Sequence, residues 1–257
     1  MSDVGPVVAS HALGAVVGEW VPVVDRHIVP RSVFVASLGR ALDLLGYDAG
    51  TAAEALDAAG RAVPSGRGVV LVTVARRDVG VTLAAPGGAP RIDVWRPAGA
   101  PVAPGAPPAP PLALVPAPWP RNHRARASRV LLVADGELLV TPPDSGTAEA
   151  RLWYDLDGRL ACAATGIVVV ELDGRLVTPP VAAGVPDTGL RRLAVERLGV
   201  AEMPLTPADL GRATGAAVLT WWGDARAVGR IDDHPCDERA GRAPAIRLRR
   251  GLDDIVS

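Results

Sequence analysis

Lysine is absent from this chain of 257 residues, so all 27 of its Lys and Arg residues are arginines. A chain without lysine cannot form an internal Schiff base, because that bond requires a neutral side-chain amine. A guanidinium group stays protonated and is a poor nucleophile. Codon bias in a GC-rich genome would also favour arginine over lysine at surface positions. That bias would not remove a lysine on which catalysis depended, because selection on an active enzyme would retain it.

Cysteine is scarce as well. Cys162 and Cys236 are too few for a disulfide framework, and they do not have the spacing of a metal site. The four histidines lie far apart in the sequence, and none belongs to a recognised metal motif. We therefore expect neither a structural metal nor a stabilising disulfide.

Long apolar runs and an excess of one charge are also missing. No apolar run approaches the ~20 residues needed to span a bilayer. The N-terminus begins with Ser2 and Asp3 rather than with the basic region of a signal peptide. The net charge of −1 gives no reason to bind nucleic acid or an anionic membrane. With 49% apolar residues, the chain is expected to fold as a cytoplasmic protein of one large or two small domains.

The first part of the chain mixes helix and strand patterns. Apolar residues at helical spacing predict a helix over residues 32–45. A second helix is expected between a cap at Thr51 and a stop at Gly60. Short β-branched runs then predict antiparallel strands at 69–75, 80–84 and 92–95.

Residues 97–118 are dominated by proline and alanine and carry no charge. Proline lacks a backbone donor and favours an extended chain, so we predict a semi-rigid connector rather than part of a sheet. A ligand for a proline-binding module is the alternative. The connector would separate a small N-terminal α+β domain, 1–96, from a larger C-terminal α+β domain, 119–257.

Turn signals are clearest in the C-terminal part. Asp157-Gly158 and Asp173-Gly174 are turn pairs that tolerate positive φ, and each lies between two short strand patterns. Two hairpins are therefore predicted, with strands over 151–154, 160–162, 167–172 and 175–177.

Helix signals follow the hairpins. Pro186, Asp187 and Thr188 are predicted to open one helix, which ends at Gly199. A shorter helix is predicted over 208–213, after the cap Thr206 and Pro207. Residues 216–222 predict a final buried strand, and 231–235 a last turn. The arginine-rich tail after Cys236 has little pattern.

About a third of the chain resembles a known family. The residues that carry the resemblance are Asp157-Gly158-Arg159, the strand over 167–171, Asp173-Gly174-Arg175-Leu176-Val177-Thr178-Pro179-Pro180, Pro204-Leu205-Thr206, Leu219-Thr220, Val228, Ile231 and Asp232. They are similar to the fold-type IV pyridoxal-phosphate (PLP) proteins, which include the class IV aminotransferases and the aminodeoxychorismate lyases. The resemblance implies a two-domain α+β fold of the D-amino-acid aminotransferase type. It also implies a PLP site in the cleft between the domains, usually in a homodimer.

The resemblance also indicates where the site departs from the family. It implies that the family lysine would fall within residues 123–128, and an ungapped register puts Ala127 there. Neither Arg124 nor Arg126 can replace a lysine. Cys162 stands where the family has a glutamate that pairs with the pyridine nitrogen, and Gly166-Ile167 replaces a Ser-Asn pair.

Both elements that hold the PLP phosphate in the family are altered. One consists of backbone N–H groups at a helix N-terminus. Its counterpart here is Pro186-Asp187-Thr188-Gly189, in which Asp187 would repel a dianion. The other matches Thr220-Trp221-Trp222-Gly223, where two indoles would fill much of the space. We therefore expect PLP not to be covalently bound.

Several residues are candidates for a remodelled cleft. The acid–base candidates are Cys162, His123 and Asp224, and the candidate ligand contacts are Arg126, Thr165, Thr188, Trp221 and Trp222. Arg126 could hold a carboxylate, and an aromatic pair suits an apolar or planar ligand. Simpler interpretations stay open: core or dimer packing for the tryptophans, a small buried hydrophobe for Cys162, and a solvated or acid-paired surface for 121–129.

Three functions remain as alternatives. The first is a pseudoenzyme that acts as a binding or partner subunit, as a homodimer or with an active paralogue. The second is a PLP-independent enzyme that uses the cleft for a small carboxylated or aromatic metabolite. The third is a non-covalent binder of PLP or of its amine form. A conventional transaminase or lyase is excluded, because the internal aldimine requires lysine.

Overall fold

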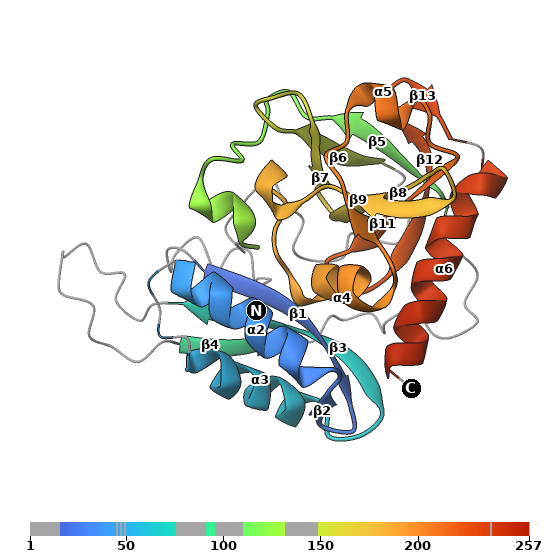
Figure 1. Cartoon of the computed structure of the whole chain (residues 1–257). Coiled ribbons are helices and arrows are strands. Elements are labelled where there is room, and N and C mark those ends of the chain that lie inside the picture. Colours follow the sequence, from blue (N-terminus) through green and yellow to red (C-terminus); the bar gives the residue numbers. More distant parts are fainter. Residues whose placement is uncertain are drawn as a thin grey trace, which may run out of the picture.

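The strands of the computed structural model form two sheets (Figure 1). The structure describes residues 16–44, 46, 48, 50–75, 91–95, 110–131, 149–236 and 238–256. A four-stranded sheet lies in the N-terminal part of the chain, and a nine-stranded sheet lies in the C-terminal part. Helices pack against both, so the chain has the α+β class predicted from the sequence.

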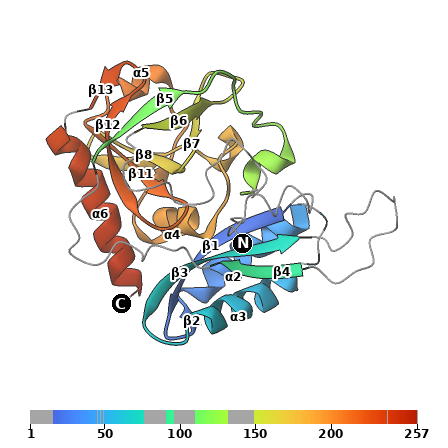
Figure 2. The ribbon, with the colours of Figure 1, turned by 180° about the vertical axis from the view of Figure 1, so that it is seen from behind.

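The four-stranded sheet is antiparallel throughout, in the order β2-β1-β3-β4. Its strands are β1 (Val16–Val24), β2 (His27–Ile28), β3 (Arg67–Ala75) and β4 (Arg91–Trp95). Helices α2 (Arg31–Leu44) and α3 (Thr51–Ala62) cover one face of this sheet (Figures 1 and 2). We call these strands and helices the small unit.

Both helices and two of the three strands predicted in the small unit are confirmed. The second helix does not end at Gly60, as predicted, but continues to Ala62. A Cβ atom on Gly60 would lie 2.4 Å from the carbonyl oxygen of Arg26, so this glycine allows close packing rather than a stop. The N-cap residue is Gly50 and not Thr51. The predicted strand over 80–84 lies outside the described residues.

The nine-stranded sheet follows the order β10-β9-β8-β11-β12-β5-β6-β7, and β7 also pairs with β8. This extra pairing closes the path β8-β11-β12-β5-β6-β7 on itself, so we call it the closed sheet. Its strands are β5 (Leu112–Pro116), β6 (Glu149–Tyr154), β7 (Leu160–Ala163), β8 (Gly166–Leu172), β9 (Arg175–Thr178), β10 (Ala201–Glu202), β11 (Gly215–Thr220), β12 (Ala225–Ile231) and β13 (His234–Pro235).

Both predicted hairpins are confirmed. Strands β6 and β7 pair antiparallel, as do β8 and β9. Gly158 and Gly174 have φ values of 76° and 75°, which fits their position in the turns.

The end of the proline-rich segment corrects a prediction. Residues Leu112–Pro116 form β5, which pairs in parallel with both β12 and β6, and so lie inside the closed sheet. Leu112 and Leu114 are fully buried there. Proline interferes with a strand only where a donor is needed, and Pro116 is the last residue of β5.

The C-terminal part also differs from the prediction. Strand β11 ends at Thr220, so Trp221 and Trp222 lie in the turn that leads to β12. The tail forms α6 (Glu238–Val256), a helix of 19 residues that buries Leu248 and Leu252. Its many arginines and the internal Pro244 conceal the helical pattern in the sequence.

Helix α4 (Gly189–Arg197) lies between the small unit and the closed sheet and contacts β1 and α2 (Figures 1 and 2). It confirms the predicted helix. Helix α5 (Pro207–Leu210) is shorter than predicted. Two 3-10 turns, η1 (Arg126–Arg129) and η2 (Val181–Ala183), complete the described helices. Within the described part of the chain, no helix has the length and apolar composition needed to cross a bilayer.

Neighbouring residues along the closed-sheet strands face two different apolar clusters. Leu152, Val168 and Val218 belong to a cluster that includes Leu205 and Leu210. The other cluster combines side chains of the small unit, α4, α6 and the opposite face of the closed sheet, among them Phe34, Leu38, Leu190, Leu248, Trp153, Ile167 and Leu219. The small unit and the closed sheet therefore share one continuous core.

Candidate functional site

The N-terminus of α4 is the part of the predicted site that the structure defines most sharply. Thr188 is the N-cap residue, and its hydroxyl accepts a hydrogen bond from the backbone N–H of Arg191 at 3.3 Å. The next N–H group, that of Gly189, donates to Oε1 of Glu19 at 2.9 Å. A carboxyl group of the small unit thus occupies the end of the helix where a ligand anion would be expected.

Glu19 lies on β1 and is only 2% exposed. The hydroxyl of Ser37, on α2, lies 2.7 Å from Glu19 Oε2 and 3.0 Å from the backbone oxygen of Asp187. Burial raises the pKa of Glu19 from 4.5 to about 7, against the opposing effect of the Ser37 and Gly189 hydrogen bonds. This carboxyl group was not among the predicted site residues, because its partners lie far away in sequence.

Arginines surround the neighbouring carboxylate of Asp187. Arg192 donates a short hydrogen bond to Asp187 Oδ2, and Arg40 Nε lies 3.6 Å from the same oxygen. Arg191 NH1 lies 3.8 Å from Oδ1. Asp187 was expected to repel a dianion. It also pairs with arginines that could otherwise attract a dianion.

Gly189 is in close contact with the small unit. A Cβ atom at this position would lie 2.3 Å from Cδ1 of Phe34, a side chain that is itself fully buried. The space beside the helix terminus is therefore filled by an aromatic ring of the protein.

The second predicted element, the turn from Thr220 to Asp224, is also engaged internally. The hydroxyl of Thr220 accepts a hydrogen bond from the N–H of Asp224 at 2.9 Å and lies 3.0 Å from its backbone oxygen. Trp221 is 2% exposed, and its indole N–H donates to the backbone oxygen of Ala164 at 2.9 Å. Trp222 is half-buried beside the same core. The carboxylate of Asp224 accepts from Arg249 of α6 at 2.7 Å.

The segment that the resemblance links to the missing lysine forms η1. Ala127 and Arg126 are both exposed on this turn. Arg121, just before it, is buried and donates to the backbone oxygens of Gly184 and Ser128. The run 121–129 therefore combines a buried structural arginine with exposed ones.

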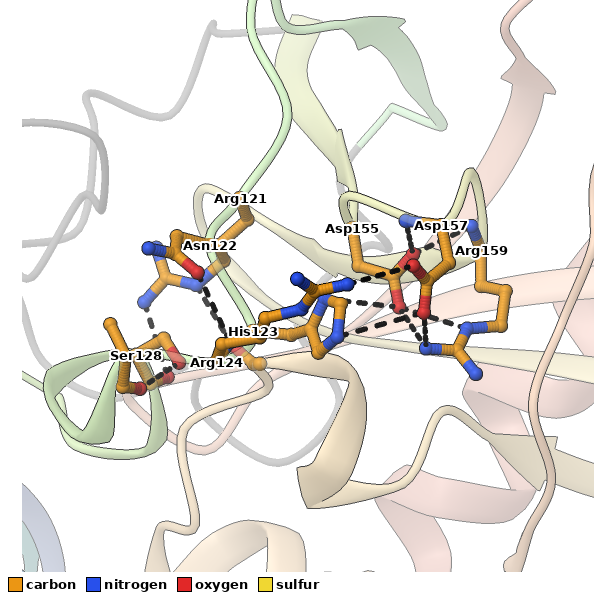
Figure 3. A network of polar contacts seen from close by, with 10 residues as sticks. Arg121, Asn122, His123, Arg124, Ser128, Asp155, Asp157 and Arg159 are labelled. Carbon is orange, nitrogen blue, oxygen red and sulfur yellow. Dashed lines mark hydrogen bonds and ion pairs between the residues drawn. The ribbon is translucent and has the colours of Figure 1, made fainter.

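His123 lies beside the turn between β6 and β7 (Figure 3). Its Nδ1 is 3.7 Å from Asp155 Oδ2, and its Nε2 is 3.6 Å from Asp157 Oδ2. These three side chains have the geometry of a possible metal-ligand set. The same two oxygens, however, already accept hydrogen bonds from Arg159, at 2.9 Å and 2.7 Å. A metal ion would have to displace this guanidinium group.

Cys162 and Thr165 lie at the start of the β7–β8 hairpin and are both buried. Cys162 belongs to the shared core. The backbone oxygen of Thr165 accepts from the N–H of Trp221 at 2.9 Å, whereas its own hydroxyl has no hydrogen-bond partner in the described structure. The other two acid–base candidates are His123 and Asp224. His123 lies close to Asp155 and Asp157, whereas Asp224 accepts a hydrogen bond from Arg249.

A small α+β unit joined through α4 to a closed sheet is the fold of the class IV aminotransferases and aminodeoxychorismate lyases. A putative 4-amino-4-deoxychorismate lyase from Legionella pneumophila superposes with a TM-score of 0.72 at 14% identity, covering 94% of this chain and 91% of that one. The 4-amino-4-deoxychorismate lyase from Pseudomonas aeruginosa gives 0.65 at 20% identity, with coverages of 93% and 91%. The PLP-bound form of a hypothetical aminotransferase from Mycobacterium tuberculosis gives 0.70 at 15% identity, with coverages of 100% and 94%.

No protein-family model matches the sequence, and no curated protein matches it either. The fold that the resemblance implied is confirmed by the solved structures, at low sequence identity.

PLP is the cofactor that this fold implies, and the residues present do not fit it. The chain has no amine side chain for the aldehyde. The Gly189 N–H is bonded to Glu19, the hydroxyl of Thr188 caps its own helix, and that of Thr220 is bonded within its own turn. Phe34 and Trp221 occupy space beside these groups.

Proposed function

We propose that this chain is a class IV aminotransferase-like protein that forms no Schiff base with PLP and acts as a binding or partner subunit. The observation that carries the proposal is the complete absence of lysine. Without an amine on a side chain, the fold cannot hold the cofactor covalently in the way that its chemistry requires.

The contacts at the α4 N-terminus support the same conclusion. A dianionic phosphate at this end would have to displace Glu19 from the Gly189 N–H and would face the carboxylate of Asp187. Both changes oppose anion binding, because the first removes a buried hydrogen bond and the second places like charges together. Non-covalent retention of PLP is accordingly the less favoured alternative.

The test is a titration of the purified protein with PLP, followed by absorbance and then by dialysis. We expect the spectrum to match free PLP and the cofactor to be lost on dialysis. Borohydride reduction and peptide mapping would identify any adduct on the α-amino group of the chain, which is the one remaining type of primary amine. Retained, shifted absorbance without such an adduct would agree with the missing Schiff base but contradict a phosphate site closed to PLP, and it would support a non-covalent PLP binder.

Ala127→Lys provides a matched variant. It restores an amine at the position that the resemblance implies, on the exposed surface of η1. We expect this variant also to lose PLP on dialysis, because the phosphate-binding groups stay engaged. Stable retention by the variant alone would mean that only the lysine was missing.

The partner role is tested by sedimentation velocity at micromolar concentration. We propose a homodimer, with an active paralogue as the alternative partner. A monomer that does not associate with a co-expressed lysine-containing paralogue would contradict the partner role.

A further inference from the structure

The contacts between Glu19, Ser37 and Asp187 need more hydrogen atoms than the Ser37 hydroxyl alone can supply. The hydroxyl of Ser37 lies within hydrogen-bond distance of two acceptors, Glu19 Oε2 at 2.7 Å and the backbone oxygen of Asp187 at 3.0 Å. A serine hydroxyl has one hydrogen and can donate to only one of them. If Glu19 is ionised, one of these two contacts has no hydrogen.

A proton on Glu19 resolves the problem. The carboxylic acid then donates from Oε2 to Ser37, and Ser37 donates to the backbone oxygen of Asp187. The other carboxyl oxygen, Oε1, continues to accept from the Gly189 N–H at 2.9 Å. The Glu19 carboxyl oxygens, the Ser37 hydroxyl and the Asp187 backbone oxygen all have a partner only in the protonated state, as expected for buried polar groups.

The charged groups around Glu19 do not strongly favour its ionised form. From the α4 side it faces Asp187, whose negative charge opposes ionisation, and Arg192, which favours it. Arg192 is paired with Asp187, and Arg40 on α2 and Arg191 lie near the same carboxylate. Glu196 faces Arg192 at 3.8 Å. Glu19 is the one titratable residue of β1, and its cross-strand neighbour on β3 is Val72.

We propose that Glu19 is a proton-dependent latch between the small unit and the N-terminus of α4. In the protonated state, a continuous chain of hydrogen bonds joins β1 through α2 to the backbone before α4. Loss of the proton makes Ser37 turn its hydrogen toward Glu19, so that the Asp187 oxygen loses its donor. This inference does not depend on the proposed function, because it concerns protons and hydrogen bonds within the chain.

The sign of the pH dependence follows from the raised pKa. The folded protein holds the Glu19 proton up to about pH 7, whereas the unfolded chain releases it near 4.5. Between these values the folded state binds more protons, so its stability falls as pH rises. The contribution of Glu19 is fully present below the unfolded value and is lost as pH rises through about 7.

Glu19→Gln is the variant that tests the latch. An amide reproduces the acceptor and the donor of the neutral acid but does not titrate. We would measure the equilibrium constant of urea unfolding from about pH 5 to about pH 8 in both proteins. The ratio of the wild-type constant to that of the variant is expected to rise by tens of fold over this range. Glu54→Gln, at an exposed position of α3, is the matched control. The ratio of the wild-type unfolding constant to that of Glu54→Gln should stay constant with pH.

Two results of the unfolding experiment would overturn the latch. One is a wild-type-to-variant ratio that does not change with pH. The other is a Glu19→Gln protein that is less stable than wild type at about pH 8. If Glu19→Gln fails to fold, the infrared band of a protonated carboxyl group can be followed in the wild-type protein and in Glu54→Gln. Such a band should be present at about pH 6 and absent at about pH 9, and its absence at both values would also overturn the proposal.

Carbonyl NMR gives a local readout that a purely structural role would not affect. The carbonyl carbon shift of Asp187 reports the hydrogen bond that its oxygen accepts from Ser37. This shift should change in the wild-type protein as pH rises through about 7 and stay constant in Glu19→Gln. Equal pH dependence in the two proteins would contradict the latch.

Discussion

Two of the carboxyl groups in the described part of the chain are buried, and they lie in different surroundings. Asp155, in the β6–β7 turn, and Glu19, on β1, are each 2% exposed. Asp155 accepts hydrogen bonds from the N–H groups of Asp157 and Arg159 and forms an ion pair with the Arg159 guanidinium at 2.9 Å. Glu19 has only neutral partners, one N–H and one hydroxyl.

The difference shows that burial alone does not determine the role of a carboxyl group. An ion pair with several hydrogen bonds fixes the shape of a turn and makes removal of one partner costly. A carboxyl group with neutral hydrogen-bond partners is better suited to hold a proton, because no cation bonds to it directly to offset its charge. Asp155 is therefore expected to stabilise its turn, and Glu19 to contribute to stability in a pH-dependent way.

Among the substitutions that test this comparison, removal of Asp155 should lower stability the most. Asp155→Ala leaves two N–H groups and part of the charge of Arg159 without a partner, so the free energy of unfolding should fall by about 3 kcal/mol. Urea unfolding measures it. Asp173→Asn, at the exposed turn of the next hairpin, is the control and should change stability by less than ~0.5 kcal/mol. Equal effects of the two substitutions would show that the Asp155 network is not structural.

Gly189→Ala tests the packing beside Glu19 without altering a carboxyl group. The new methyl group would lie 2.3 Å from Phe34 Cδ1, so either the ring or the helix terminus must shift. We expect a loss of about 1–3 kcal/mol in thermal or urea unfolding. Gly39→Ala is the matched control, because no atom lies within 4 Å of its Cβ position in α2. That change should stabilise the helix by up to ~1 kcal/mol, and a neutral Gly189→Ala would contradict the close packing.

Thr188→Ala should have the smallest effect. It removes the side-chain cap of α4 but leaves the Glu19–Gly189 hydrogen bond, so a loss of about 1 kcal/mol is expected. Ser65→Ala, at an exposed position, should change stability by less than ~0.5 kcal/mol. The difference in pH dependence between wild type and Glu19→Gln should persist in a Thr188→Ala background. Its loss there would mean that the cap and not Glu19 controls the junction.

Local sequence signals predicted the elements that depend on local interactions. The turns at Gly158 and Gly174 and the cap at Thr206 depend on residues within a few positions, so their hairpins and helix could be identified. Strand β5 could not, because its place between β12 and β6 depends on pairing with distant parts of the chain. Strand β1 was missed for the same reason, since its partner β3 begins at Arg67.

The candidate site shows the same limit. Thr188 and Asp187 were identified from the helix-start pattern, and the structure places both at the α4 terminus. Glu19 escaped notice because an isolated acidic residue in an apolar run carries no local signal, and its partner Gly189 is 170 positions away. Asp155 and Arg159 were likewise missed as a pair around His123.

The shared apolar core has a consequence for how the chain unfolds. Side chains of α2, α4, α6 and the closed sheet belong to one cluster. If the small unit detached, it would expose apolar surface on both sides of the separation, at a cost of ~25 cal/mol for each Å². The two units are thus expected to form one cooperative folding unit, in which neither is stable alone and a hinge motion between them is strongly opposed.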